Sequence, residues 1–165
     1  MELYEVVSSI RRLELMRRIM TRRVLRNLGL HPGQPPMIEY VISHPGCTQK
    51  NVADELDITP ASAASSLKRL EKAGIIRREA DLNDCRCNRL YATELGKQKS
   101  TDAKEAFNAL DIRMFAGISD EERVMYKTLC ERMFENMADE TTRGLTICKL
   151  HSAADNIFSK QEEEN

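Results

Sequence analysis

The sequence predicts a mainly α-helical fold that includes one small β-hairpin. Apolar residues recur every three or four positions over most of the chain, which is the spacing of one helix face. Alternation of apolar and polar residues is confined to the two sides of a single polar turn, which is typical of a hairpin. The chain has 165 residues, 41% of them hydrophobic, with eight Met and no Trp. This composition suits one ordinary globular unit of helices packed through aliphatic side chains.

The N-terminal segment predicts one long helix that ends at Gly29, because glycine readily adopts the left-handed conformation that closes a helix. Its apolar stripe consists of Leu3, Val6, Val7, Ile10, Leu13, Met16, Met20, Val24 and Leu28. A terminal helix with a single apolar stripe is expected to pack on another helix. That partner could belong to a second chain or to a bundle within this one, because periodicity does not distinguish the two.

Three short helices are expected next. The first begins near Pro35, since proline is tolerated in a first helical turn. Thr48 is a suitable N-cap for the second helix, and Thr59, followed by proline, is a suitable N-cap for the third, which runs to Gly74. The turn at residues 57–58 is short, so the second and third helices form a helix-turn-helix.

A hairpin is expected immediately after the helix-turn-helix. Ile75 and Ile76 begin one strand, the polar segment Leu82–Asn88 forms the turn, and Arg89–Ala92 forms the returning strand.

The remainder predicts further helices. Thr93 caps a long one that closes at Gly117. Ser119 and Glu122 fit a capping box that opens the next, and a last amphipathic piece covers Leu145–Phe158.

Charge is unevenly distributed although the net charge is only −1. Residues 1–30 hold seven Arg and three Glu, or +4, and residues 60–78 hold five basic residues and one Glu, again +4. Residues 98–165 hold nine basic and fourteen acidic residues, or −5. A segregated positive face favours contact with a polyanion. No run approaches the roughly 20 apolar residues that span a bilayer, and charges interrupt the N-terminal segment, so we expect a cytoplasmic protein.

The segment Gly29–Lys97 resembles the MarR family of winged helix-turn-helix transcriptional regulators, which are bacterial or archaeal proteins. The most diagnostic residues are Asp84 and Arg86 in the hairpin turn, followed by Leu90–Thr93 and Gly96. The resemblance implies a winged helix-turn-helix with dimerisation helices at both ends of the chain. It divides the chain into an N-terminal dimerisation helix (1–30), a DNA-binding domain (31–97) and C-terminal dimerisation helices (98–165). It also implies a homodimeric repressor on a pseudo-palindromic operator in double-stranded DNA.

The predicted DNA contacts combine this resemblance with residue chemistry. The resemblance implies that Arg86 enters a minor groove and that Asp84 orients it, which the negative potential of a narrow groove favours. The alternative is a solvated turn in which the two merely pair. Small and hydroxylated residues on the third short helix can approach base edges, while nearby cations can bind phosphates. The full set is Thr48, Thr59, Ala61, Ser62, Ala64, Ser65, Lys68, Arg69, Arg77, Arg78, Asp84, Arg86 and Arg89. For Arg69, pairing with an acidic side chain is the structural alternative.

The resemblance also implies control by an effector, and the sequence leaves its class open. A small aromatic or phenolic ligand would bind near Arg12, Arg17, His31 and Tyr40. Cys85 and Cys87, beside arginines, could respond to oxidation, or could be incidental exposed thiols.

The resemblance also leaves a metal effector open, because His44 and Cys47 have a spacing that can hold zinc and His31 lies in the same connecting region. His31, His44 and Cys47 do not make a complete metal set, so no metal or cofactor is expected. All five cysteines are expected to be reduced, with Cys130 and Cys148 as buried core thiols.

Two other functional classes agree less well with the sequence. A winged helix can act as a protein-interaction module without DNA, although the positive segment 60–78 disfavours this. An enzyme is not expected, because the sequence has no glycine-rich phosphate loop and no Ser-His-Asp arrangement.

Overall fold

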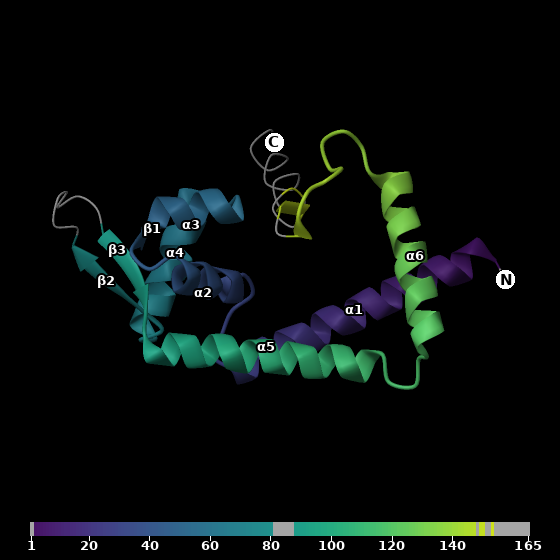
Figure 1. The fold of residues 1–165 in the computed structure, drawn as a ribbon, viewed down its shortest axis with the longest axis horizontal. Coiled ribbons are helices and arrows are strands. Elements are labelled where there is room, and N and C mark those ends of the chain that lie inside the picture. The colour runs from purple at the N-terminus through teal and green to yellow at the C-terminus, as the bar shows by residue number, and fades with distance from the viewer. Residues whose placement is uncertain (1, 81–87, 148, 151–152, 154–165) are drawn as a thin grey trace, which may run out of the picture.

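The computed structural model describes residues 2–80, 88–147, 149–150 and 153, and it has an elongated shape (Figure 1). A winged unit built from α2, α3, α4 and the strands lies at one end, and α5 runs from it toward α6 at the other end. The elements are α1 (Leu3–Asn27), α2 (Gln34–Ser43), β1 (Cys47–Thr48), α3 (Gln49–Leu56), α4 (Pro60–Lys72), β2 (Ile76–Ala80), β3 (Asn88–Ala92), α5 (Glu94–Met114) and α6 (Asp120–Met137).

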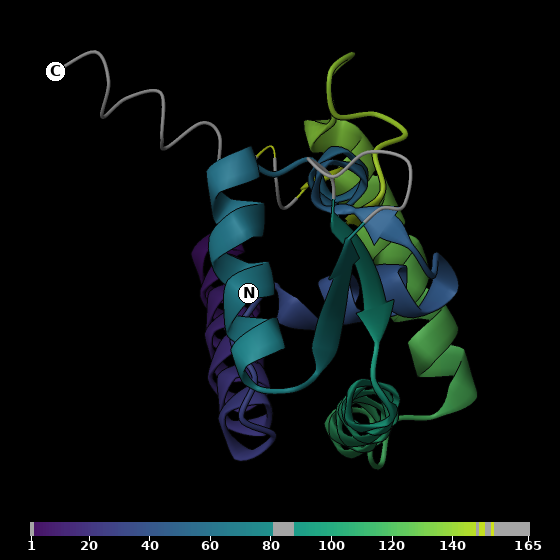
Figure 2. The same cartoon turned by 90° about the vertical axis from the view of Figure 1, so that its left-hand side faces the viewer.

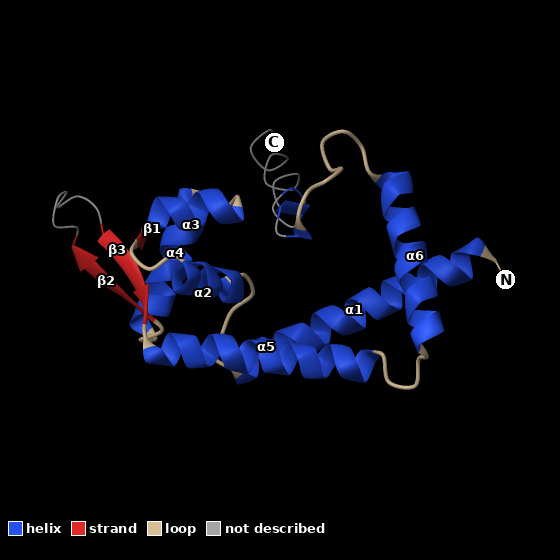
Figure 3. Cartoon of the chain, in the orientation of Figure 1, coloured by secondary structure: helices blue, strands red, loops and turns tan. Residues whose placement is uncertain are grey.

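The predicted fold class is confirmed, because helices dominate and the strands form one small antiparallel sheet (Figure 3). The sheet order is β1-β3-β2, with Arg78 opposite Leu90 in the hairpin and Cys47 opposite Leu90 on the other side. The two-residue strand β1 was not predicted. Of the last predicted helix, Leu145–Phe158, the described residues 147, 149, 150 and 153 are helical.

Local signals set the helix boundaries. Four helices begin at a hydroxyl residue whose side chain accepts a hydrogen bond from the backbone N–H three residues later: Thr48, Thr59, Thr93 and Ser119. Such a cap typically contributes about 0.5–2 kcal/mol. Gly29 and Gly74 follow α1 and α4 with φ of +70°, the left-handed conformation that favours glycine.

The hydrophobic core lies in the winged unit. Its fully buried large side chains are Ile38, Val41, Val52, Leu67, Leu70, Ile76 and Leu90, from α2, α3, α4 and the sheet. Leu25 of α1 and Ala103 of α5 pack against the same core. By contrast, α6 has no buried residue. The winged unit is therefore a closed core, whereas the far end of the molecule is not.

The start of α5 is fixed tightly to the segment that follows α4. The Thr93 N–H donates to the Ile75 carbonyl (3.1 Å), and the Thr93 hydroxyl lies 2.6 Å from the Gly74 carbonyl oxygen. A Cβ on Gly96 would lie 2.2 Å from the Ile75 carbonyl oxygen. Only glycine fits there, so this close approach explains why Gly96 belongs to the predicted motif.

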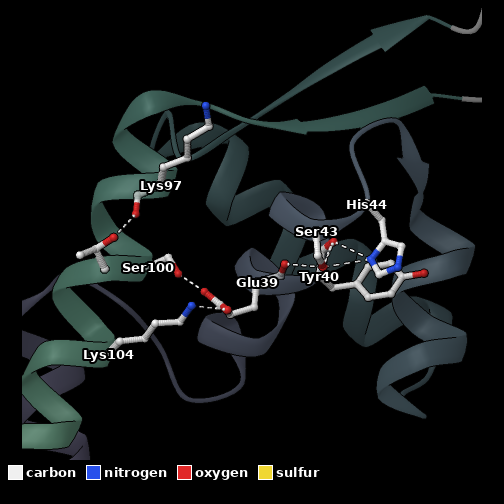
Figure 4. A network of polar contacts seen from close by, with 8 residues as sticks. Glu39, Tyr40, Ser43, His44, Lys97, Ser100 and Lys104 are labelled. Atoms are coloured by element: carbon white, nitrogen blue, oxygen red, sulfur yellow. Dashed lines mark hydrogen bonds and ion pairs between the residues drawn. The ribbon is translucent and has the colours of Figure 1, made fainter.

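A polar cluster joins α2 to α5 near the same end (Figure 4). Lys104 lies 2.7 Å from the Glu39 carboxylate, and Ser100 donates a hydrogen bond to the same carboxylate. Burial raises the pKa of Glu39, but the hydrogen bonds from Lys104 and Ser100 outweigh it and hold that pKa below its ordinary value. The winged unit is thus tied to α5 at two places.

Candidate nucleic-acid interface

The outer face of α4 is exposed beside the hairpin (Figure 2). Ala63, Leu67 and Leu70 are buried in the core. The predicted contact positions Ala61, Ser62, Ser65 and Lys68 are exposed, and Ala64 is half-buried. A helix with small residues on its open face can enter a major groove about 12 Å wide.

The serines on this face are oriented by neighbouring side chains. The Thr59 hydroxyl donates to the Ser62 hydroxyl oxygen (2.9 Å), and Arg69 donates to the Ser65 hydroxyl oxygen (3.0 Å). Each serine therefore accepts one hydrogen bond and keeps its own O–H to donate. Thr59 also accepts from the Ser62 N–H (3.2 Å), which makes its role at the start of α4 architectural.

Thr48 likewise acts as the N-cap of α3. Its hydroxyl accepts from the Asn51 N–H (3.2 Å), and its own N–H donates to the Asn51 side-chain oxygen (2.9 Å). This capping box satisfies the backbone N–H groups of Thr48 and Asn51 at the start of α3.

The predicted phosphate-binding cations fall into two groups. Lys68 and Arg69 are exposed and form no ion pair with an acidic residue in the part of the chain that the structure describes. Arg78 is paired with Glu71 at 3.0 Å, and Arg77 is paired with Glu79. A phosphate would have to replace a carboxylate at Arg77 or Arg78. Lys68 and Arg69 therefore offer the more available positive charge.

The hairpin is anchored on both sides of β3. Arg89 donates to the Gly46 carbonyl oxygen (3.1 Å), which holds β3 against the segment that enters β1. The Arg77 guanidinium lies over the Tyr91 ring, 4.7 Å from its centre, in a cation–π contact. The predicted wing residues Asp84 and Arg86 lie outside the described residues.

The predicted effector residues occupy different places. Arg12 is exposed on α1, and Arg17 lies 3.5 Å from Asp111 of α5. Arg17 and His31 line different cavities. Tyr40 stacks on His44, with ring centres 4.3 Å apart. Their joint role in ligand binding stays a prediction.

The cysteines have unlike surroundings. Cys47 is buried in β1, and burial raises the pKa of its thiol, which makes it less reactive. Cys130 was expected in the core but is only half-buried, because α6 has no buried residue. Its hydrogen bond with Tyr126 raises the pKa of that phenol. Cys85, Cys87 and Cys148 lie outside the described residues.

Two further properties bear on function. The described residues contain no group of three His, Cys, Asp or Glu side chains placed to hold a metal ion. None of the helices in the described ranges is both long and apolar enough to cross a membrane.

Sequence reasoning missed several residues that shape the interface. Tyr91 could have been found, because the hairpin register places it directly opposite Arg77. The pair Arg78–Glu71 joins residues of different elements, and no local pattern announces it. The buried polar residue Gln34 was also missed, since proline and glycine around it indicate only a loop and a helix start.

Comparison with known proteins agrees with this geometry. The model of the MarR family matches residues 28–86. A protein of Thauera aromatica, named as a transcriptional regulator for the hcr operon, is 27% identical over 113 residues, or 68% of each chain.

Two solved structures share the fold. The crystal structure of MarR has a TM-score of 0.60 with 25% identity, covering 82% of this chain and 97% of that one. A mutant of Staphylococcus aureus MepR bound to an oligodeoxyribonucleotide has a TM-score of 0.63 with 21% identity, covering 84% and 100%.

Proposed function

Because the chain is a MarR-family transcription regulator with a DNA-binding winged helix, we propose that it acts as a homodimeric repressor on a pseudo-palindromic operator. The observation that carries the proposal is that one chain has both an exposed face on α4 and exposed apolar side chains at the far end of the molecule.

In the proposed complex, α4 lies in the major groove. Ser62 and Ser65 donate hydrogen bonds to base edges or phosphates, and Ala61 and Ala64 face thymine methyl groups. Lys68 and Arg69 bind phosphates, which position the protein without specifying sequence. Arg86, oriented by Asp84, reaches the adjacent minor groove.

The proposed dimer is supported by the exposed apolar residues of the terminal helices. They include Leu3, Leu13, Met16 and Ile19 on α1, Ile112 on α5, and Val124, Met125, Leu129, Met133 and Met137 on α6. An 18-residue helix with no buried side chain gains little stability from its own chain. A second copy would cover these faces and place two α4 helices on half-sites about 34–36 Å apart.

We also propose that the repressor is released by a small ligand or by oxidation of Cys85 or Cys87. A ligand releases DNA only if it binds more tightly to the arrangement that does not fit the operator. Peroxide treatment that leaves operator binding unchanged would remove the cysteines from this part of the proposal.

The experiment that tests the function is selection of bound fragments from the source genome, followed by titration of the selected duplex at several salt concentrations. We expect affinity to fall steeply with salt, because phosphate contacts release counterions. Sedimentation equilibrium at micromolar concentration should give twice the chain mass. Equal binding to every duplex, with no salt dependence, would instead favour a protein-interaction module.

Arg86→Ala tests the wing within the same assay. The substitution is expected to weaken operator binding while the circular dichroism spectrum stays unchanged. Unaltered affinity would remove Arg86 from the set of DNA contacts.

A further inference from the structure

Ser65 lies at the middle of the exposed face of α4. Ala63 and Leu67 are fully buried, and each is two residues from Ser65. At about 100° of rotation per residue, Ser65 therefore lies nearly opposite both buried side chains. A helix that enters a major groove with its exposed face toward the bases brings the middle of that face closest to them. Ser65 is thus the side chain of α4 best placed to contact a base edge.

The Ser65 hydroxyl is held by Arg69, which lies one turn later on the same face. The Arg69 guanidinium donates a hydrogen bond to the Ser65 oxygen (3.0 Å). A guanidinium can only donate, so this contact makes the Ser65 oxygen the acceptor. The Ser65 proton donates to no acceptor among the described residues. Ser65 therefore keeps an unused donor that is directed away from Arg69.

Other hydroxyl side chains in the helices use their proton differently. In four cases the hydroxyl donates to the backbone carbonyl oxygen four residues earlier: Ser9, Ser43, Thr101 and Thr128. This arrangement is common inside helices, and it leaves no proton for another molecule. Ser65 does not form the corresponding bond within the part of the chain that the structure describes. The contact with Arg69 takes its place.

Ser62, one turn before Ser65, has a different kind of partner. Its oxygen accepts a hydrogen bond from the Thr59 hydroxyl (2.9 Å). A hydroxyl can either donate or accept, so Thr59 and Ser62 can exchange roles and suit a base of either kind. Arg69 cannot exchange roles with Ser65. Of the two serines, Ser65 is the one whose partner restricts it to donating.

The positive charge of Arg69 strengthens this restriction. A hydrogen bond from a cation polarises the Ser65 O–H, which makes it a stronger donor. In the major groove, guanine and thymine present the acceptor oxygens O6 and O4, whereas adenine and cytosine present amino groups, which are donors. An amino group facing Ser65 would meet another donor and a positive charge. A keto oxygen instead matches the Ser65 proton.

We propose that Arg69 determines specificity by positioning Ser65, so that the base facing Ser65 in each half-site carries a keto oxygen, as guanine and thymine do. The inference rests on the proposed function and gives Arg69 a role beyond phosphate contact. Without Arg69, the Ser65 hydroxyl can turn to donate or to accept, and it would suit either class of base. The other N–H groups of Arg69 stay available to a phosphate.

The test uses the full chain and duplexes that carry the selected operator. The base facing Ser65 is the one at which Ser65→Ala loses its preference. There the keto base is replaced by the amino base of the same ring size: guanine by adenine, or thymine by 5-methylcytosine, which keeps the methyl group. We expect this exchange to weaken binding of the unaltered chain about fivefold, the value of one ordinary hydrogen bond. An amino base at this position of the selected operator, or no preference that depends on Ser65, would overturn the proposal.

Two alanine variants of α4 separate positioning from phosphate binding. Arg69→Ala should reduce the fivefold preference to less than about twofold, whereas loss of a phosphate contact alone weakens binding to all duplexes equally. Lys68→Ala removes the same charge from the neighbouring position, so it should weaken binding to both duplexes and keep the preference. Both side chains are exposed and alanine favours helix, so neither variant is expected to unfold the chain. An Arg69→Ala protein that keeps the preference would contradict the positioning role.

The double variant of Ser65→Ala and Arg69→Ala tests whether the two side chains act as one unit. Its preference should equal that of Ser65→Ala, because Arg69 acts on the base only through Ser65. A preference that survives in Ser65→Ala and disappears in the double variant would mean that Arg69 contacts the base itself, which overturns the inference. A chain that binds no duplex overturns the proposed function as well. Duplex binding without the keto preference overturns this inference alone.

Discussion

Replacing Gly96 with alanine tests how the winged unit is joined to α5. The new Cβ would lie 2.2 Å from the backbone oxygen of Ile75, whereas real contacts essentially never fall under 3.0 Å. The helix would have to move by at least 0.8 Å, the difference between these two distances. The obstacle is backbone, so a side-chain rotation cannot relieve it.

The size of the effect follows from three contributions. Overpacking of this kind costs about 1–3 kcal/mol. The same movement strains the two hydrogen bonds from Thr93 to the Gly74 and Ile75 carbonyls, each worth about 1 kcal/mol. Alanine offsets about 1 kcal/mol through its higher helix propensity. We therefore expect Gly96→Ala to lower the free energy of unfolding by about 2–4 kcal/mol.

Urea unfolding followed by circular dichroism measures this difference, at one fixed protein concentration because dimerisation would shift the midpoint. Lys97→Ala is the matched control, since Lys97 is the exposed neighbour on the same helix and should change stability by no more than about 0.5 kcal/mol. A Gly96→Ala protein as stable as the control would refute the close approach between α5 and Ile75.

Three further predictions concern other contacts. The lowered pKa of Glu39 means that its ionised form stabilises the fold above its ordinary value of 4.5, and that this stability is lost as the pH falls below it; acid unfolding of Glu39→Gln should show a weaker pH dependence in that range. Thr59→Ala removes the acceptor for the Ser62 N–H and should lower the free energy of unfolding by about 0.5–2 kcal/mol in the same urea assay. Thr59→Ser keeps the hydroxyl and should not show this loss of stability. Lys68→Ala should reduce the slope of log affinity against log salt by about 0.9 on the selected operator, and an unchanged slope would exclude a phosphate contact at Lys68.

The sequence predicted those parts of the fold that depend on neighbouring residues. The caps at Thr48, Thr59 and Thr93 were correct, because an N-cap is decided within one turn of helix. The strand β1 was missed, since it has two residues and exists only through pairing with β3, some forty positions later. Periodicity contains no information about such distant pairing.

The candidate interface shows the same division. The exposed face of α4 was predicted from helical spacing, because Leu67 and Leu70 fix the buried side. The ion pair between Arg78 and Glu71 was not predicted. In the sequence both residues have the pattern of solvent-exposed charges, and they meet only because the hairpin folds beside α4. Cys130 is only half-buried because no residue of α6 is buried, and the α6 sequence alone does not determine this.

The double attachment of the winged unit to α5 makes that helix a lever. Its 21 residues extend about 32 Å at 1.5 Å per residue. In the proposed dimer, a tilt of α5 by about 6° where it meets the partner would displace the attached winged unit by about 3 Å. That distance is close to the 3.4 Å step between stacked base pairs. A small change in the angle of α5 would therefore shift one recognition helix by about one base pair relative to its half-site.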